Sequence, residues 1–284
     1  MKKAKILRKL IPLLIAVFAL VIISCLAFVI YTFSGNYITY SKKYTSNVTP
    51  SDTTIKESNI IVYNGILLGA SKDGAWIDAK KYYEAKPAVK NIEVNLYSND
   101  KLYGTFNTAS IRKHKDGLFY TTIGKDTLPT QYLAVSANIG KNLSFAKQYE
   151  PGEQEEKYVK EALASYKMLN GGVNITEAFM ANIEGVNDKI ICATAKKAGI
   201  LGVYSAVVYV TDNTAHLVKY AYVRDRKNAD SWPVFSVKHI KDVNGDNKPE
   251  IILEEVTGNF VYYTIQELRE KNTFYQVLET SVKL

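Results

Sequence analysis

Residues 234–282 read VFSVKHIKDVNGDNKPEIILEEVTGNFVYYTIQELREKNTFYQVLETSV, and this stretch decides the fold class. Apolar and polar residues alternate along its runs, which is the period of a strand with one buried face. Short turns separate the runs, so neighbouring strands can pair as antiparallel hairpins. The strands predicted for this half of the chain are Ile175–Ile183, Lys189–Ala195, Gly202–Thr211, Ala215–Val223, Val234–Lys241, Glu250–Val256, Phe260–Leu268 and Phe274–Val282.

One amphipathic helix is predicted ahead of these strands, from Glu153 to Leu169. Its apolar residues recur at helical spacing, and three glutamates in its first turns favour the helix dipole. Pro151-Gly152 marks the break before it, and Gly171-Gly172 supplies a stop. Residues 153–284 are therefore expected to form a helix followed by an antiparallel strand meander.

A second β-rich region is predicted over residues 59–148. Several of its short strands are separated by turn signals such as Lys115-Asp116-Gly117. This number of strands suggests a small barrel or sandwich, while Ile77–Glu84 suits a short helix. The fold class is thus mainly β, a β-rich α+β protein. The strands expected here are Ile60–Ala70, Ile92–Tyr97, Leu102–Ile111, Leu118–Ile123 and Tyr132–Ala137.

An N-terminal membrane anchor is the clearest functional signal. Residues Ile11–Phe33 carry no charge, and as a helix they would extend about 34 Å, enough for a hydrocarbon core of about 30 Å. Five basic residues lie in the tail 1–10, so the positive-inside rule places that tail in the cytoplasm. The chain is predicted to be a single-pass protein of the plasma membrane, with its bulk extracytoplasmic. Residues 34–58, rich in Ser, Thr, Asn, Lys and Tyr, read as a linker.

Two alternatives to the anchor remain open. A cleaved signal peptide, giving a secreted protein, has the same basic start but a shorter apolar core. Ile22-Ile23-Ser24-Cys25 resembles the lipobox of bacterial lipoproteins, which implies lipidation at Cys25. The apolar run continues past Cys25, where lipoproteins usually turn polar.

Net charge and cysteine content exclude two classes of protein. The formal charge is +8, and the five basic residues of the tail leave only +3 for the rest of the chain. Such a balance gives no reason to expect a nucleic-acid partner. Cys25 and Cys192 lie in different regions, so a disulfide scaffold is excluded.

The loop Asp242–Glu250 is the one constellation with chemistry in it. Its sequence DVNGDNKPE places oxygen-bearing side chains at positions 1, 3, 5 and 9, and calcium takes six to eight oxygen ligands. Gly245 and Asn247 can adopt the positive φ angles that a tight loop requires. The predicted metal ligands are Asp242, Asn244, Asp246, Glu250 and the carbonyl of Lys248.

This loop resembles the calcium loop of FG-GAP and VCBS-type repeats, Asp-x-Asp/Asn-x-Asp-Gly-x-Pro-Glu followed by an apolar strand. The match covers residues 234–257 only, and Asn247 stands where the repeats have glycine. The resemblance implies calcium ligation by Asp242, Asn244, Asp246 and Glu250 in an extracellular β protein. One copy is too little for a whole β-propeller.

A plain hairpin turn is the competing interpretation of the same residues. Asn244-Gly245 is a strong tight-turn signal in its own right, and surface turns are rich in Asp and Asn. The loop also departs from an EF-hand, because position 6 is Asn247 and position 12 is Leu253.

No motif of a catalytic or nucleotide-binding site occurs in the chain. His114, His216 and His239 lack metal-ligand spacing, and Cys192 sits in an apolar run typical of a buried residue. We therefore expect a non-catalytic binding or structural module of the cell envelope. Its expected partners are membrane lipid at residues 11–33 and an envelope polymer or protein. An envelope hydrolase and an accessory or sensor subunit of a membrane complex are the alternatives.

Overall fold

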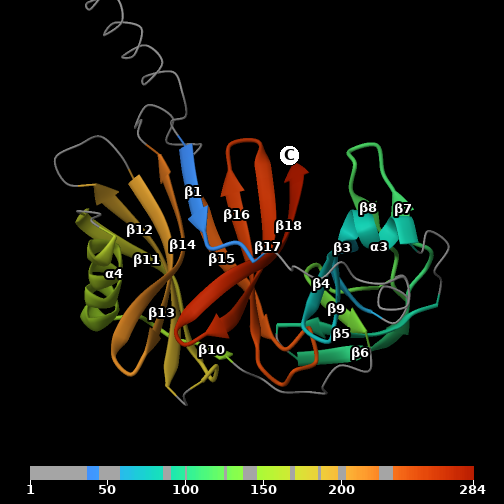
Figure 1. Ribbon diagram of the computed structural model, residues 1–284, viewed down its shortest axis with the longest axis horizontal. Helices are drawn as coiled ribbons and strands as arrows, with labels where there is room; N and C mark the ends of the chain where they lie inside the picture. Colours follow the sequence, from blue (N-terminus) through green and yellow to red (C-terminus); the bar gives the residue numbers. More distant parts are fainter. Residues whose placement is uncertain are drawn as a thin grey trace, which may run out of the picture. The chain divides into compact units, whose positions relative to one another are not determined.

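The computed structural model (Figure 1) describes residues 37–44, 58–85, 91–99, 101–124, 127–136, 146–166, 170–184, 187–197, 203–223 and 233–284. Contacts divide the chain into two units, Met1–Ile38 and Thr39–Leu284, and the second is the folded β unit. The predicted tail 1–10, the predicted span Ile11–Phe33 and Cys25 lie outside the described residues. Within the described ranges, no helix is both long and apolar enough to cross a membrane.

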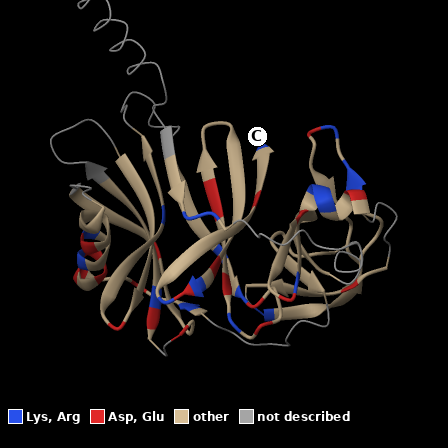
Figure 2. Cartoon of the chain, in the orientation of Figure 1, with Lys and Arg blue, Asp and Glu red and all other residues tan. Residues whose placement is uncertain are grey.

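The mainly β part of the predicted fold class is confirmed, because strands dominate the described residues and the strand pairs from β2 to β18 are antiparallel. Acidic and basic residues are interspersed over it, most visibly along the helix at the edge of the view (Figure 2). The six-stranded sheet has the order β1 (Tyr37–Ser41), β14 (Thr214–Val223), β13 (Val203–Thr211), β12 (Asp188–Lys197), β11 (Asn170–Ala181) and β10 (Ala146–Gln148).

The helix α4 (Glu153–Ser165) packs on one face of this sheet. Its buried stripe includes Tyr158, Val159, Ala162 and Leu163, the spacing of one helical face. Glu155 accepts a hydrogen bond from the backbone N–H of Gly152 at 2.8 Å, which satisfies a donor at the helix start. The helix ends before the predicted Leu169, and Gly171 and Gly172 lie inside β11 instead of forming the stop.

The four-stranded sheet is the meander expected from the quoted stretch, in the order β15 (Val234–Lys241), β16 (Glu250–Thr257), β17 (Phe260–Glu270) and β18 (Thr273–Lys283). It lies against the face of the six-stranded sheet opposite α4, with β15 near β11, β12 and β13. All residues of β13 are consequently buried.

The eight-stranded sheet holds the N-terminal β region. Its path is open, running from edge strand β6 to edge strand β7, so the expected barrel does not form in the described residues. The order is β6 (Lys101–Asn107), β5 (Glu93–Ser98), β9 (Leu133–Ser136), β2 (Asn59–Tyr63), β3 (Ile66–Lys72), β8 (Phe119–Tyr120) and β7 (Arg112–Lys113), with β4 (Ala75–Asp78) also paired to β3.

Two local predictions in this region need correction. The single strand expected over Ile60–Ala70 is a hairpin, because Asn64 and Gly65 take φ angles of 48° and 82° and turn the chain. The helix expected at Ile77–Glu84 is α3 (Ala79–Ala85), but Ile77 belongs to β4.

The four-stranded and eight-stranded sheets share one apolar core. It joins Tyr63, Trp76 and Leu133 of the eight-stranded sheet to Ile252 and Leu278 of the four-stranded sheet. The N-terminal β region therefore packs directly on the C-terminal meander, while the predicted boundary between residues 148 and 153 stays a prediction.

Part of the predicted linker 34–58 is folded. β1 pairs with β14 at the edge of the six-stranded sheet, and Lys43 forms a parallel bridge with Gln276 of β18. A polar stretch can take this place because an edge strand keeps one side of its backbone open to solvent.

Candidate functional site

The loop predicted to bind metal connects β15 to β16, and the pair Lys241–Glu250 closes the ladder below it. Asp242 is 5% exposed and organises the turn, since its carboxylate accepts bonds from the N–H groups of Gly245 at 2.6 Å and Asn247 at 2.9 Å. Gly245 and Asn247 have φ angles of 89° and 68°, as their residue types led us to expect.

Two further side chains repeat this pattern along the loop. Asn244 Oδ1 accepts from the N–H of Asp246 at 2.8 Å, and Asp246 Oδ1 accepts from the N–H of Lys248 at 2.8 Å. Each is a local turn in which a short polar side chain bonds the backbone two residues on. The predicted side-chain ligands thus hold the loop in shape by themselves, and Lys248 lies exposed at its outer end.

Glu250 is the buried centre of the site, with 0% of its surface exposed. Its Oε2 accepts from the N–H of Val243 at 2.8 Å, and its Oε1 accepts from the amide nitrogen of Asn244 at 2.9 Å. The same amide nitrogen donates to Glu267 Oε1 at 3.2 Å. Asn244 therefore lies between two carboxylates and donates to both.

Glu267 is the site residue that the sequence did not reveal. One oxygen from each of Asp246, Glu250 and Glu267 lies within 4.8 Å of the others. In the antiparallel ladder Ile251 faces Gln266, so Glu267 of β17 stands beside Glu250 of β16. The register of the β16–β17 hairpin therefore identifies Glu267 as the neighbour of Glu250. Alternation of apolar residues in the sequence does not give that register, so Glu267 could not be assigned to the site from the sequence.

Burial dominates the protonation of the site. It raises the pKa of Glu250 well above its usual range, and the charges of Asp246 and Asp242 raise it further. Burial also raises the pKa of Asp242, against the effect of the amides of Gly245 and Asn247. The pKa of Glu267 is raised by burial as well, although Arg269 and Trp76 oppose that shift.

The loop is tied to the eight-stranded sheet through Glu267 and Val243. Trp76 of β4 donates its indole N–H to Glu267 Oε2 at 3.0 Å. Arg269 pairs with the same carboxylate and also donates to the carbonyl of Gly74 at 2.9 Å. Ser71 of β3 donates to the carbonyl of Val243 at 3.3 Å. Any change in the charge of this cluster therefore acts on the contact between the two sheets.

Three of the carboxylates, those of Asp246, Glu250 and Glu267, come close enough together to hold a hard cation. The predicted ligands Asp242 and Asn244 are not part of this group, because the Asp242 carboxylate accepts from the amides of Gly245 and Asn247 and Asn244 turns its amide nitrogen toward Glu250 and Glu267. A cation at the point where Asp246, Glu250 and Glu267 converge would stabilise the ionised form of a carboxylate that burial otherwise disfavours.

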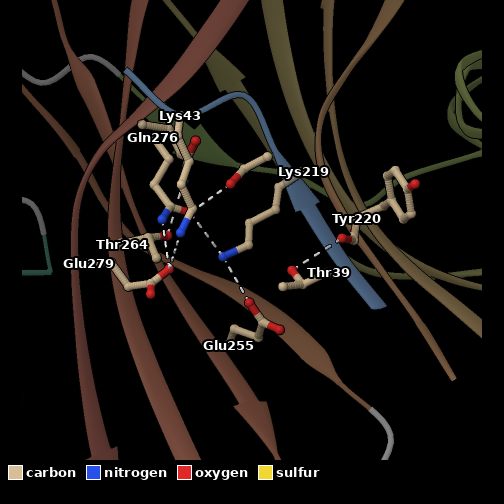
Figure 3. Close-up of polar contacts among 10 residues, drawn as sticks. Thr39, Lys43, Lys219, Tyr220, Glu255, Thr264, Gln276 and Glu279 are labelled. Atoms are coloured by element: carbon tan, nitrogen blue, oxygen red, sulfur yellow. Dashed lines mark hydrogen bonds and ion pairs between the residues drawn. The ribbon is translucent and has the colours of Figure 1, made fainter. Parts of the chain in front are cut away.

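A second polar cluster lies between the six-stranded and four-stranded sheets (Figure 3). The ammonium of Lys219 (β14) and the carboxylate of Glu255 (β16) are 2.8 Å apart, and each side chain is only 2% exposed. Lys219 also donates to Gln276 Oε1 at 3.4 Å, and Gln276 donates to Glu279 at 2.6 Å. Burial lowers the pKa of Lys219 and raises that of Glu255, because a dry site disfavours the charged form of each group.

The histidines and Cys192 lie on separate elements. His114 is in a turn beside Asp116 at 3.1 Å, His216 is in β14, and His239 is in β15 against Tyr63. Cys192 of β12 is fully buried, and burial raises the pKa of its thiol well above the usual range. This environment is that of an inert packing residue.

Comparison with known proteins gives no match, whether with family models, with curated proteins or with solved structures.

Proposed function

We propose that the chain is a non-catalytic, extracytoplasmic module of the cell envelope, held in the membrane by residues 11–33 and braced by a calcium ion at the loop Asp242–Glu250. The observation that carries the cation is Glu250, a carboxylate with 0% exposure whose oxygen lies within 4.8 Å of oxygens of Asp246 and Glu267. The membrane part rests on the uncharged run Ile11–Phe33 behind a basic tail.

The electrostatic argument starts from the charge that the loop concentrates. Three carboxylates come together, those of Asp246, Glu250 and Glu267, and Arg269 pairs with Glu267. An ionised carboxylate in a low-dielectric site is costly unless it is paired or bound to a metal. A divalent cation supplies that partner, whereas burial by itself raises the pKa of Glu250 and so favours its protonated form.

Calcium suits this set better than magnesium. The donors come from an irregular loop and from a neighbouring strand, and calcium accepts six to eight oxygens in irregular geometry. Magnesium demands near-ideal octahedral geometry and keeps several waters. The resemblance of Asp242, Asn244, Asp246 and Glu250 to the FG-GAP and VCBS-type loop supports the same ion.

The role of the ion is structural on this proposal. The loop contacts Trp76, Gly74 and Ser71 through Glu267, Arg269 and Val243, so a bound ion would fix the four-stranded sheet against the eight-stranded sheet. An affinity in the range of about 10⁻⁴–10⁻³ M is typical of extracellular calcium modules. The surface stabilised in this way would be a rigid binding surface for an envelope polymer or protein.

The test is thermal unfolding of the full chain in detergent, in EDTA, in 5 mM calcium and in 5 mM magnesium, each concentration being roughly ten times the expected Kd. A calcium-specific rise in Tm is expected, of about 1.4 kcal/mol in stability at ten times Kd. Asp246→Asn keeps the acceptor for the Lys248 N–H but removes one charge, and it should abolish the rise.

Asp116→Asn is the matched control, because Asp116 accepts from the N–H of Leu118 at 2.9 Å in a similar turn far from the site. It should leave the calcium response unchanged. An equal Tm in calcium and in EDTA for the unaltered chain would remove the cation from the proposal.

A further inference from the structure

Residues 39–44, here called the strap, belong to two sheets at once. As part of the edge strand β1 the strap pairs with β14, and Thr39 donates its hydroxyl to the carbonyl of Tyr220 at 3.4 Å. A few residues on, the N–H of Gln276 donates to the carbonyl of Lys42 at 2.7 Å, and the N–H of Tyr44 donates to the carbonyl of Gln276 at 3.1 Å. One short segment thus bridges the six-stranded and four-stranded sheets.

The strap also completes the buried polar cluster below it. Ser41 Oγ lies 2.8 Å from Gln276 Oε1, the atom that also accepts from Lys219. Lys43 lies 4.0 Å from Glu279, which in turn accepts from Gln276. Figure 3 shows Lys43, Gln276 and Glu279 gathered on one side of the cluster, with Lys219 extending toward them from the other side and its ammonium joined to Glu255. With Lys43 in place, two lysines face two glutamates.

Aromatic rings hold the two ends of the strap. Tyr40 stacks on Tyr220 with ring centroids 5.3 Å apart. Tyr44 meets Tyr275 edge-on at 6.5 Å, and the guanidinium of Arg269 lies 3.5 Å from the Tyr44 ring centroid. Both contacts are made to strands that the rest of the chain already fixes.

Burial differs sharply between the strap and what it covers. Thr39, Lys42 and Lys43 are exposed, and the other three strap residues are only half-buried. The ion pair of Lys219 and Glu255 below them is 2% exposed. Segments with little buried apolar surface and solvent-exposed backbone bonds open at lower free energy than the core.

We infer that the strap is a latch that opens as a unit while the rest of the three sheets stays folded, and that its opening admits water to the Lys219–Glu255 pair. The strap is the first part of the unit Thr39–Leu284, so the backbone enters that unit at the latch. This inference depends on neither the cation nor the membrane span, because every group in it lies in the described unit.

Two measurements on the full chain test the latch. Native-state hydrogen exchange compares the amides of Tyr44 and Gln276 with that of Leu253 in the centre of β16. Acetylation of lysines, read by mass spectrometry, follows access to Lys219. The amides of Tyr44 and Gln276, which bond across the strap, should exchange at least tenfold faster than that of Leu253. Lys219 should be acetylated at a rate that changes in parallel with their exchange, under conditions in which the core does not exchange.

A strap variant and a matched control complete the test. Ser41→Ala with Lys43→Ala removes one hydrogen bond and one exposed ion pair, which should speed both readouts about tenfold. Lys157→Ala removes a similar exposed pair, with Glu161 at 3.9 Å, and should change neither. Exchange of the strap amides only at the rate of global unfolding would overturn the latch. Acetylation of Lys219 that ignores the double substitution would overturn it too.

Discussion

Replacement of Lys219 by methionine tests how the buried ion pair contributes to stability. Lys219 and Glu255 are each 2% exposed and 2.8 Å apart, so the variant leaves the Glu255 carboxylate in a dry site without the ammonium. Removal of one partner from a buried pair costs about 3–5 kcal/mol. For a folded unit of this size, that loss corresponds to a fall in Tm of roughly 6–20 °C.

The reverse single change and the double change complete a cycle. Glu255→Gln should cost a similar amount, because it leaves the Lys219 ammonium buried. Lys219→Met with Glu255→Gln removes both charges together, and replacement of both partners is often close to neutral. The double variant should therefore lie within about 2 kcal/mol of the unaltered chain, a coupling well above the error of the method.

The pH dependence of the two single variants distinguishes them. In Lys219→Met the acid Glu255 has a raised pKa, so the variant loses stability as pH rises through that value. In Glu255→Gln the base Lys219 has a lowered pKa, so that variant regains stability as pH rises above it. The two stability differences from the unaltered chain should therefore change with pH in opposite directions.

Urea unfolding of the full chain, followed by tryptophan fluorescence from pH 5.5 to pH 9, measures all four proteins. Lys157→Met is the control, because its partner Glu161 and Lys157 itself are exposed, and such pairs contribute at most about 1 kcal/mol. Additive single effects, or pH slopes of the same sign, would refute the account of a coupled buried pair.

Two further predictions concern the cation loop and the core. Calcium should raise Tm more at pH 8 than at pH 5.5. Burial raises the pKa of Asp242, Glu250 and Glu267, so the stability that their protonated forms contribute is lost as pH rises. Calcium binds the ionised carboxylates and should therefore restore more stability at pH 8, whereas protons compete with it at pH 5.5. A calcium effect that is largest at pH 5.5 would contradict this. Gly69→Ala should cost about 3 kcal/mol in urea unfolding, since its φ is +156° and a Cβ would lie 2.6 Å from the carbonyl oxygen of Ile77. Gly74→Ala is its control at a φ of +73°, where nothing lies within 4 Å, and it should cost about 1 kcal/mol from backbone strain alone. Equal losses in the two glycine variants would rule out the steric argument.

The C-terminal meander was predictable because parts of its strands bury alternate residues, as β18 does over most of its length. β15 begins and ends at the predicted residues, Val234 and Lys241, and its buried positions alternate from Phe235 to His239. β2 and β3 show the opposite case, since nearly all their residues are buried on both faces and the alternation disappears. Asn64-Gly65 is a turn signal, but apolar residues on both sides of it favoured the prediction of one strand over Ile60–Ala70.

Long-range pairing explains what the sequence did not reveal about the two polar clusters. The strap pairs with residues 180 or more positions away, such as Tyr220, so no local pattern marks it as a strand. Glu267 joins Glu250 only through the register of β16 and β17. The ligands within the loop were visible because their spacing is local, whereas partners supplied by other strands depend on the folded sheet.

Arg269 connects the two clusters physically. Its guanidinium lies 3.5 Å from the ring centroid of Tyr44 in the strap, and the same side chain pairs with Glu267 of β17, beside the cation loop. A cation that binds Glu267 competes with Arg269 for that carboxylate, so the two sites share one side chain. Linkage then imposes a strict condition, because coupling between two binding equilibria is reciprocal. If calcium changes the equilibrium constant for strap opening by a given factor, complete opening of the strap must change the affinity for calcium by the same factor. Exchange of the strap amides measures the first quantity, and calcium titration measures the second.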